Sequence, residues 1–121
     1  MLAMMYSGRA LALLLTVVAL ASGCGGDDGD SGQRIDDILA LSGSATAGED
    51  VFMITCGDIV CHGPDGSVGA APNLPEKIPE LSRAEIVDIV VNGFEEMDPL
   101  GPDLTDQQIA DAIAYVIGEF Q

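Results

Sequence analysis

The sequence is poor in basic residues, with four Lys and Arg against 20 Asp and Glu and a formal charge of −16. Proteins that bind nucleic acid through its phosphates need clustered cations, so this composition excludes that class. Tryptophan is absent, aromatic residues make up only 4% of the chain, and there is a single histidine. The 121 residues are enough for one small domain, but they supply few large side chains for its core. We therefore expect a staple or a cofactor to supplement that core.

No apolar run reaches the roughly 20 residues that a membrane-spanning helix needs. The longest run, residues 10–21, follows Arg9 and has the length of a signal-peptide hydrophobic region. It ends in small residues before Cys24 (ASGC), which resembles the lipobox of bacterial lipoproteins. The resemblance implies removal of residues 1–23, a lipid on Cys24, and a location on the periplasmic side of a membrane or at the cell surface. Ordinary secretory cleavage and an uncleaved N-terminal anchor are the alternatives.

The chain beyond Cys24 divides into a polar linker and one domain. Residues 25–33 (GGDDGDSGQ) contain no apolar side chain, so they cannot bury enough surface to offset the entropy of ordering. We therefore predict a flexible tether over residues 24–33. Residues 34–121 hold the remaining apolar side chains and are predicted to form a single folded domain.

Two cysteines and the only histidine lie close together in residues 56–63 (CGDIVCHG). A disulfide between Cys56 and Cys61 is the simplest interpretation in an exported chain. The histidine that directly follows Cys61 favours another, because the string resembles the c-type haem attachment motif C-x-x-C-H with a longer spacer. In that motif the two thiols form thioethers to the haem and the histidine, here His62, binds the iron. Gly57 offers the backbone freedom that a longer spacer needs.

A haem iron held by histidine takes methionine as its second axial ligand in many electron-transfer cytochromes. Only Met53 and Met97 lie beyond the predicted signal peptide. Met53 lies just before Cys56 and cannot easily reach the opposite face of a haem, so it is predicted to be a core side chain. Met97 lies in a loop rich in proline and glycine, residues 93–102 (GFEEMDPLGP), where a core role explains it poorly. It is the candidate sixth ligand.

Helix signals recur along the predicted domain. Boxes of Ser or Thr with Glu or Gln three residues later begin at Thr46, Ser82 and Thr105, and each predicts the start of a helix. A short helix is expected over residues 35–41. The β-branched run at residues 86–91 would also suit a strand, but the chain offers no second strand to pair with it. The predicted fold class is therefore all-α.

The order of these elements resembles class I cytochromes c from the first capping box to the last helix. In that family the first helix carries a glycine and an aromatic residue, here Gly48 and Phe52, and crosses the last helix near an aromatic such as Tyr115. A proline after the attachment motif, here Pro72, accepts a hydrogen bond from the axial histidine. The resemblance implies one covalent haem c in a small helical fold, held by Cys56 and Cys61, with His62 and Met97 on the iron.

The predicted function is electron transfer by an exported, membrane-tethered cytochrome. Because protein side chains fill both axial positions, no substrate site remains, and we expect neither enzyme activity nor a catalytic residue. The excess of negative charge predicts redox partners with a basic docking surface and association that is faster at low salt. The protein is expected to be a monomer, with its lipid anchor in the membrane and no nucleic-acid partner.

Three alternatives remain at this point. A haem sensor or a peroxidase-like enzyme would need a labile Met97. A disulfide-stapled lipoprotein with a structural or interaction role would bind no haem. A metal site formed by Cys56, Cys61 and His62 would need a fourth ligand, which no motif supplies.

Overall fold

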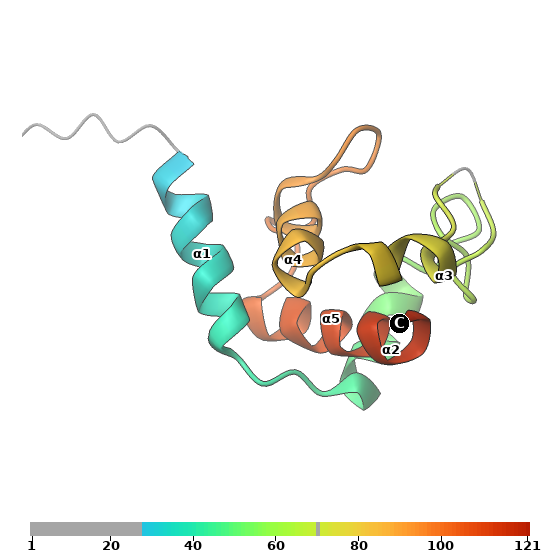
Figure 1. Ribbon diagram of the computed structural model, residues 1–121, viewed down its shortest axis with the longest axis horizontal. Coiled ribbons are helices and arrows are strands. Elements are labelled where there is room, and N and C mark those ends of the chain that lie inside the picture. The colour runs from blue at the N-terminus through green and yellow to red at the C-terminus, as the bar shows by residue number, and fades with distance from the viewer. Residues whose placement is uncertain (1–27, 70) are drawn as a thin grey trace, which may run out of the picture.

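The computed structural model describes residues 28–69 and 71–121 (Figure 1). Cys24, the predicted signal peptide and the first part of the predicted tether lie outside the described residues. Within them the chain forms only helices, apart from one isolated bridge between Phe94 and Met97, so the all-α prediction is confirmed. No helix in these residues is long and apolar enough to cross a membrane. The elements are α1 (Asp28–Ala40), α2 (Ala45–Thr55), α3 (Leu74–Lys77), the 3-10 turn η1 (Ile78–Glu80), α4 (Arg83–Asn92) and α5 (Asp106–Phe120).

Capping side chains determine where the longer helices begin. Ser82 and Thr105 form full capping boxes with the residues three positions later, as predicted for α4 and α5. The box predicted at Thr46 is wrong, because α2 begins two residues earlier with Ser44 as its N-cap. The Ser44 hydroxyl accepts a hydrogen bond from the Ala47 N–H, so Ser44 caps the helix and Thr46 lies within its first turn.

Helix α1 differs from the sequence-based expectation of a short helix at residues 35–41. It begins at Asp28, so residues 28–33 of the predicted tether are helical. Asp30 in the first turn is favourable for the helix dipole. The main cause lies further along, where Ile38 is fully buried and Arg34 contacts distant parts of the chain. These tertiary contacts order a segment whose composition alone predicts flexibility.

The crossing of α2 over α5 is the largest helix contact, and it follows the predicted pattern. Gly48 is buried at the crossing, where an added Cβ would overlap the Asp111 carbonyl. The rings of Phe52 and Tyr115 lie 5.3 Å apart between centroids, and Phe120 completes the aromatic cluster at 5.8 Å from Phe52. The crossing depends on glycine because only glycine lets the two backbones come this close.

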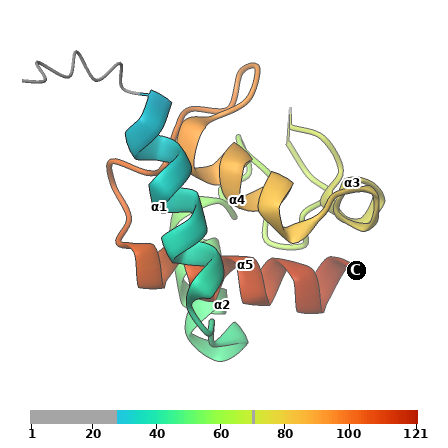
Figure 2. The same cartoon turned by 60° about the vertical axis from the view of Figure 1, so that its left-hand side comes forward.

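Two loops project to the same side of α5 in both ribbon views (Figures 1 and 2). The Cys loop, residues 56–73 with residue 70 outside the description, follows α2 and leads to α3. The Met97 loop, residues 93–104, connects α4 to α5. Helix α4 and η1 lie on this side of α5 as well, so the fold brings both loops and these elements around one space.

Candidate functional site

A large cavity occupies the space between the two loops, η1, α4 and α5. Its volume is about 1340 Å³, above the ~300–1,000 Å³ that is typical of small-molecule sites. Charged side chains also line it, and all of them are exposed, so they form its rim. The apolar wall consists of Phe52, Val60, Ala71, Pro72, Leu74, Ile78, Leu81, Ile86, Ile89, Val90, Phe94, Leu100, Leu104, Ala112, Ile113 and Val116.

The four-residue spacer between the cysteines folds as a compact turn around Asp58. The Asp58 carbonyl accepts hydrogen bonds from the Cys61 and Gly63 N–H groups, both at 2.9 Å. Its carboxylate accepts a third from the Val60 N–H at 2.8 Å. The extra residues bulge outward, and Ile59 is 70% exposed. The bulged loop predicted from the longer spacer is therefore present, and its turns fix the spacing of the two thiols.

The prediction that Gly57 supplies backbone freedom is wrong. Its backbone does not adopt a positive φ, whereas Gly69 does so at φ +106°. A Cβ on Gly69 would overlap the Cys61 carbonyl, so the return of the Cys loop past the second cysteine requires glycine there. The conformational freedom is used after the motif rather than inside the spacer.

Both cysteines line the cavity as free thiols. Cys56 is the C-cap of α2, and its N–H donates to the Phe52 carbonyl at 2.7 Å. Burial raises the pKa of the Cys56 thiol to about 11, with a smaller contribution from Cys61. Cys61 is exposed at the edge of the cavity. The buried thiol is thus neutral at physiological pH.

His62 is half-buried and lines the same cavity. Burial lowers the pKa of the imidazole, and the adjacent Pro72 backbone opposes this shift. Pro72 therefore lies beside the ring, but the predicted hydrogen bond from the imidazole is not formed in this structure, because the buried Nδ1 has no hydrogen-bond partner. The lowered pKa keeps the imidazole neutral at physiological pH, which is the form that binds a metal.

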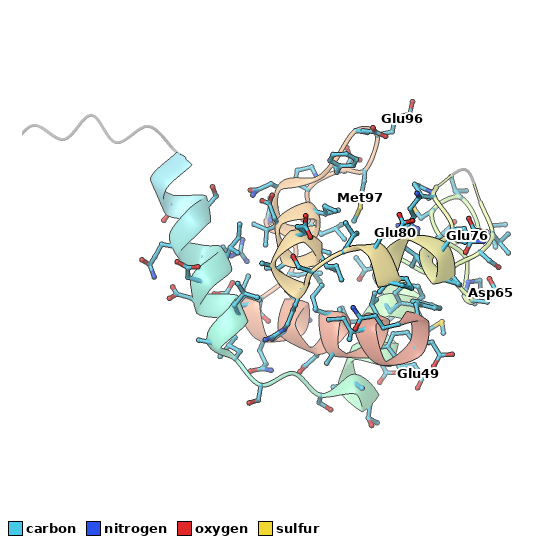
Figure 3. All side chains as sticks on the ribbon, in the orientation of Figure 1. Glu49, Asp65, Glu76, Glu80, Glu96 and Met97 are labelled. Atoms are coloured by element: carbon cyan, nitrogen blue, oxygen red, sulfur yellow. The ribbon has the colours of Figure 1, made fainter. Side chains whose placement is uncertain are left out.

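Met97 reaches the cavity from the opposite loop. Its backbone pairs with Phe94 through two hydrogen bonds, at 2.8 and 3.0 Å. Glu95 between them takes a positive φ of 51°, which closes a tight turn. Figure 3 shows Met97 pointing back towards the body of the domain, whereas Glu96 points away from it. The half-buried Met97 thioether thus lines the same cavity as the cysteines and His62 of the Cys loop.

Met53 does not compete for this role. Its side chain is 38% exposed and does not line the cavity. The prediction that Met53 is a core side chain is therefore wrong, because helical spacing placed it on the outer face of α2. The expectation that it cannot reach the site agrees with its position.

The residues around the cavity fit a haem c. Two neighbouring thiols, a neutral imidazole and a thioether lie around one apolar space, and these are the side chains that covalent haem attachment and axial ligation require. Within the described residues there is no group of three or more His, Cys, Asp or Glu that could hold a metal ion. A closed zinc site therefore lacks ligands there. All five predicted site residues line this cavity: Cys56, Cys61, His62, Pro72 and Met97.

One wall of the cavity was not predicted from the sequence. Helix α3 and η1 are short and each has proline near its start, and they contribute Leu74 and Ile78 to the cavity. The prolines at their first helical positions are the sequence feature that could have predicted these two short helices. Ile78 is 4% exposed, so this segment joins the core to the cavity wall.

Comparison with known proteins gives one family match. A family model described as "Cytochrome C oxidase, cbb3-type, subunit III" matches residues 43–116. The matched region runs from just before α2 into α5 and contains all five site residues, whereas α1 precedes it. No curated protein and no solved structure gives a significant match.

Proposed function

The chain belongs to the family of the cytochrome c oxidase, cbb3-type, subunit III, and on that premise we propose that its domain binds one haem c and acts as an electron carrier with His/Met axial ligation. The observation that carries this proposal is the convergence of two thiols, an imidazole and a thioether on one apolar cavity. When bound, haem supplies a one-electron iron couple.

Each donor has a separate role in this proposal. Cys56 and Cys61 would hold the haem covalently, His62 would bind the iron from the Cys loop, and Met97 would bind it from the opposite loop. The Pro72 carbonyl lies beside the imidazole and would accept a hydrogen bond from Nδ1 in the haem-loaded protein, which would support a single tautomer. The apolar wall around the cavity suits the soft thioether as a ligand. No catalytic role remains for the acidic residues, and we infer that the protein is not an enzyme.

The sequence supports an exported and membrane-anchored location for this carrier. The apolar run at residues 10–21 and Cys24 after small residues suit cleavage and acylation. Cys24, as the first residue of the mature chain, would then tie the domain to the periplasmic side of a membrane or to the cell surface. Mass spectrometry of the mature protein from a bacterial host tests this, because an unacylated N-terminus beyond Cys24 would remove the anchor.

Replacing Met97 tests the axial ligation. We expect the ferrous wild-type protein to bind little carbon monoxide at neutral pH, because both axial positions are filled. Met97→Ala should bind it stoichiometrically and should lower the reduction potential. Met53→Ala, which removes the other methionine of the mature chain, serves as the control and should behave as the wild type. Rapid carbon monoxide binding by the wild type would favour a sensor or a peroxidase-like enzyme instead.

The rim of the cavity supports a basic redox partner. Among the described residues that line the cavity, Lys77 is the one Lys or Arg, and it pairs with Glu80 at 3.2 Å. Exposed Phe94 and Val60 add apolar contact area beside the charges. The acidic residues on the rim are Glu80, Glu85, Asp88, Glu95, Glu96 and Asp98.

We expect electron exchange with a basic redox protein to slow as salt rises, because counterions screen the rim. Replacing Glu95 and Glu96 with Gln should slow the exchange at low salt by roughly tenfold. Glu49→Gln is the matched control, since Glu49 is exposed on α2 and does not line the cavity. Stopped-flow kinetics over a range of salt concentrations measure the effect. A rate that is independent of salt would contradict the proposed partner surface.

A further inference from the structure

Helix α1 precedes the region that matches the family, yet it makes specific contacts with the loop that carries the predicted iron ligand. We propose that Arg34 of α1 is a positioning residue that holds the Met97 loop in the conformation required for ligation. This inference rests on the proposed function, because it assigns Arg34 a role towards the haem that Met97 would bind.

The guanidinium of Arg34 joins three points at the end of the Met97 loop. Nη1 donates to the Gly101 carbonyl at 2.7 Å, and Nη2 donates to the Leu104 carbonyl at 2.9 Å. Nε donates to the Asp106 carboxylate at 2.8 Å, so the third contact is an ion pair at the start of α5. A planar group with donors in a fixed fork suits such a three-point contact, which lysine could not reproduce.

This part of the loop also forms two backbone hydrogen bonds with α4. The Leu100 N–H donates to the Val90 carbonyl at 2.9 Å, and the Gly101 N–H donates to the Val91 carbonyl at 3.2 Å. Gly101 therefore lies between α4 and Arg34, and a Cβ there would come within 2.9 Å of Arg34 Nη1. Three helices thus meet at this limb of the loop: α4 through its carbonyls, α1 through Arg34, and α5 through its first turn.

The loop segment that Arg34 contacts lies between two cavities, so its position affects where Met97 is held. Leu100 and Leu104 line the haem cavity on one side of the loop. On the other side a smaller cavity of about 360 Å³ lies against α1 and is lined by Arg34, Pro99 and Pro102 among others. Without Arg34 the loop would have room to move away from the haem towards α1, and Met97 would move with it.

Arg83, the first residue of α4, provides a control because its guanidinium also contacts α1. Its guanidinium donates to the carbonyls of Leu39 and Leu41 at 3.0 and 3.1 Å, so it ties the C-terminal end of α1 to α4. It has no hydrogen bond to the Met97 loop among those described. Arg83→Gln thus removes one positive charge and two hydrogen bonds at the end of α1. These contacts do not involve the Met97 loop.

The test compares Arg34→Gln with Arg83→Gln in the haem-loaded protein. We expect Arg34→Gln to keep its covalent haem but to lose much of the weak Met-to-iron band of the oxidised protein. Carbon monoxide binding to its ferrous form should be about tenfold faster, as should hydrogen exchange of the amides in residues 93–104. Asp106→Asn, which removes the ion pair but leaves both carbonyl contacts, should give an intermediate effect. Arg83→Gln should lower the melting temperature while leaving the band and the loop amides unchanged.

Two results would overturn the inference. One is an Arg34→Gln variant with an unchanged band and unchanged loop exchange; the other is an equal effect of Arg34→Gln and Arg83→Gln on both readouts, which would mean a merely structural role. Failure of the proposed function gives a different result, since the wild type would then lack covalent haem and the band. In that case the hydrogen exchange of residues 93–104 still decides whether Arg34 holds the loop.

Discussion

Replacing Cys56 and Cys61 together with Ala is expected to abolish both covalent haem and stable folding. The cavity of about 1340 Å³ lies at the centre of a domain that is already poor in aromatic side chains. Protein interiors are close-packed, and an unfilled space of this size would leave the apolar side chains of its wall without packing partners on the cavity side. We therefore expect a clear loss of helical circular dichroism and of a cooperative thermal transition, together with loss of haem in the denatured protein.

The third cysteine supplies the control for this experiment. Cys24→Ala should remove acylation but leave haem content and helical signal as in the wild type, because the predicted attachment uses only the other two thiols. A Cys56→Ala, Cys61→Ala variant that is free of haem and still melts cooperatively at the wild-type temperature would show that the core is complete without a cofactor. That outcome would contradict the disulfide-stapled alternative as well, because the variant lacks both thiols of that disulfide.

The second large effect is expected from Gly48→Ala in α2. The added Cβ would overlap the Asp111 carbonyl, and it would lie 2.9 Å from the Ala112 N. Backbone atoms cannot rotate away as a side chain can, so α2 and α5 would have to separate along their crossing. We expect the free energy of unfolding to fall by about 3 kcal/mol, at the upper end of overpacking effects. Chemical denaturation of the haem-loaded protein measures this.

Gly118→Ala is the matched control for the crossing. Gly118 lies in α5, and an added Cβ there meets no atom within 4 Å. Because alanine favours a helix over glycine, we expect a gain of about 0.5–1 kcal/mol. Equal destabilisation by the two substitutions would contradict the close approach of the helices at Gly48.

The part of the site that consists of short local sequence motifs could be predicted from the sequence. The cysteines and His62 lie in one short string, and Met97 lies in a loop whose composition made a core role a poor explanation. Capping boxes likewise predicted the starts of α4 and α5, because a cap is a contact within four residues. The crossing at Gly48 followed from the order of elements that the family resemblance implied.

The features that the sequence did not predict depend on contacts far along the chain. Residues 28–33 read as a flexible linker, but Arg34 and Ile38 fix α1 to segments about 70 residues away. The wall formed by α3 and η1 has the same origin, since four- and three-residue helices are stable only when packed against a domain. Met53 was assigned to the core although it lies on the outer face of α2.

The helical N-terminal segment also changes the expected tether. Of the predicted flexible residues 24–33, those from Asp28 onward belong to α1. Since Arg34 links α1 to the Met97 loop, the helix nearest the predicted lipid anchor is also the one that supports the predicted iron ligand.

The most direct test of the proposed haem protein is a visible absorption spectrum of the chain co-expressed with a c-type maturation system. It should be recorded in the oxidised and reduced native states and again after denaturation. We predict haem that remains with the denatured chain, and in the oxidised native protein the weak band of methionine bound to iron. A denatured chain without haem would contradict covalent attachment through Cys56 and Cys61 and, with it, electron transfer as the function of this domain.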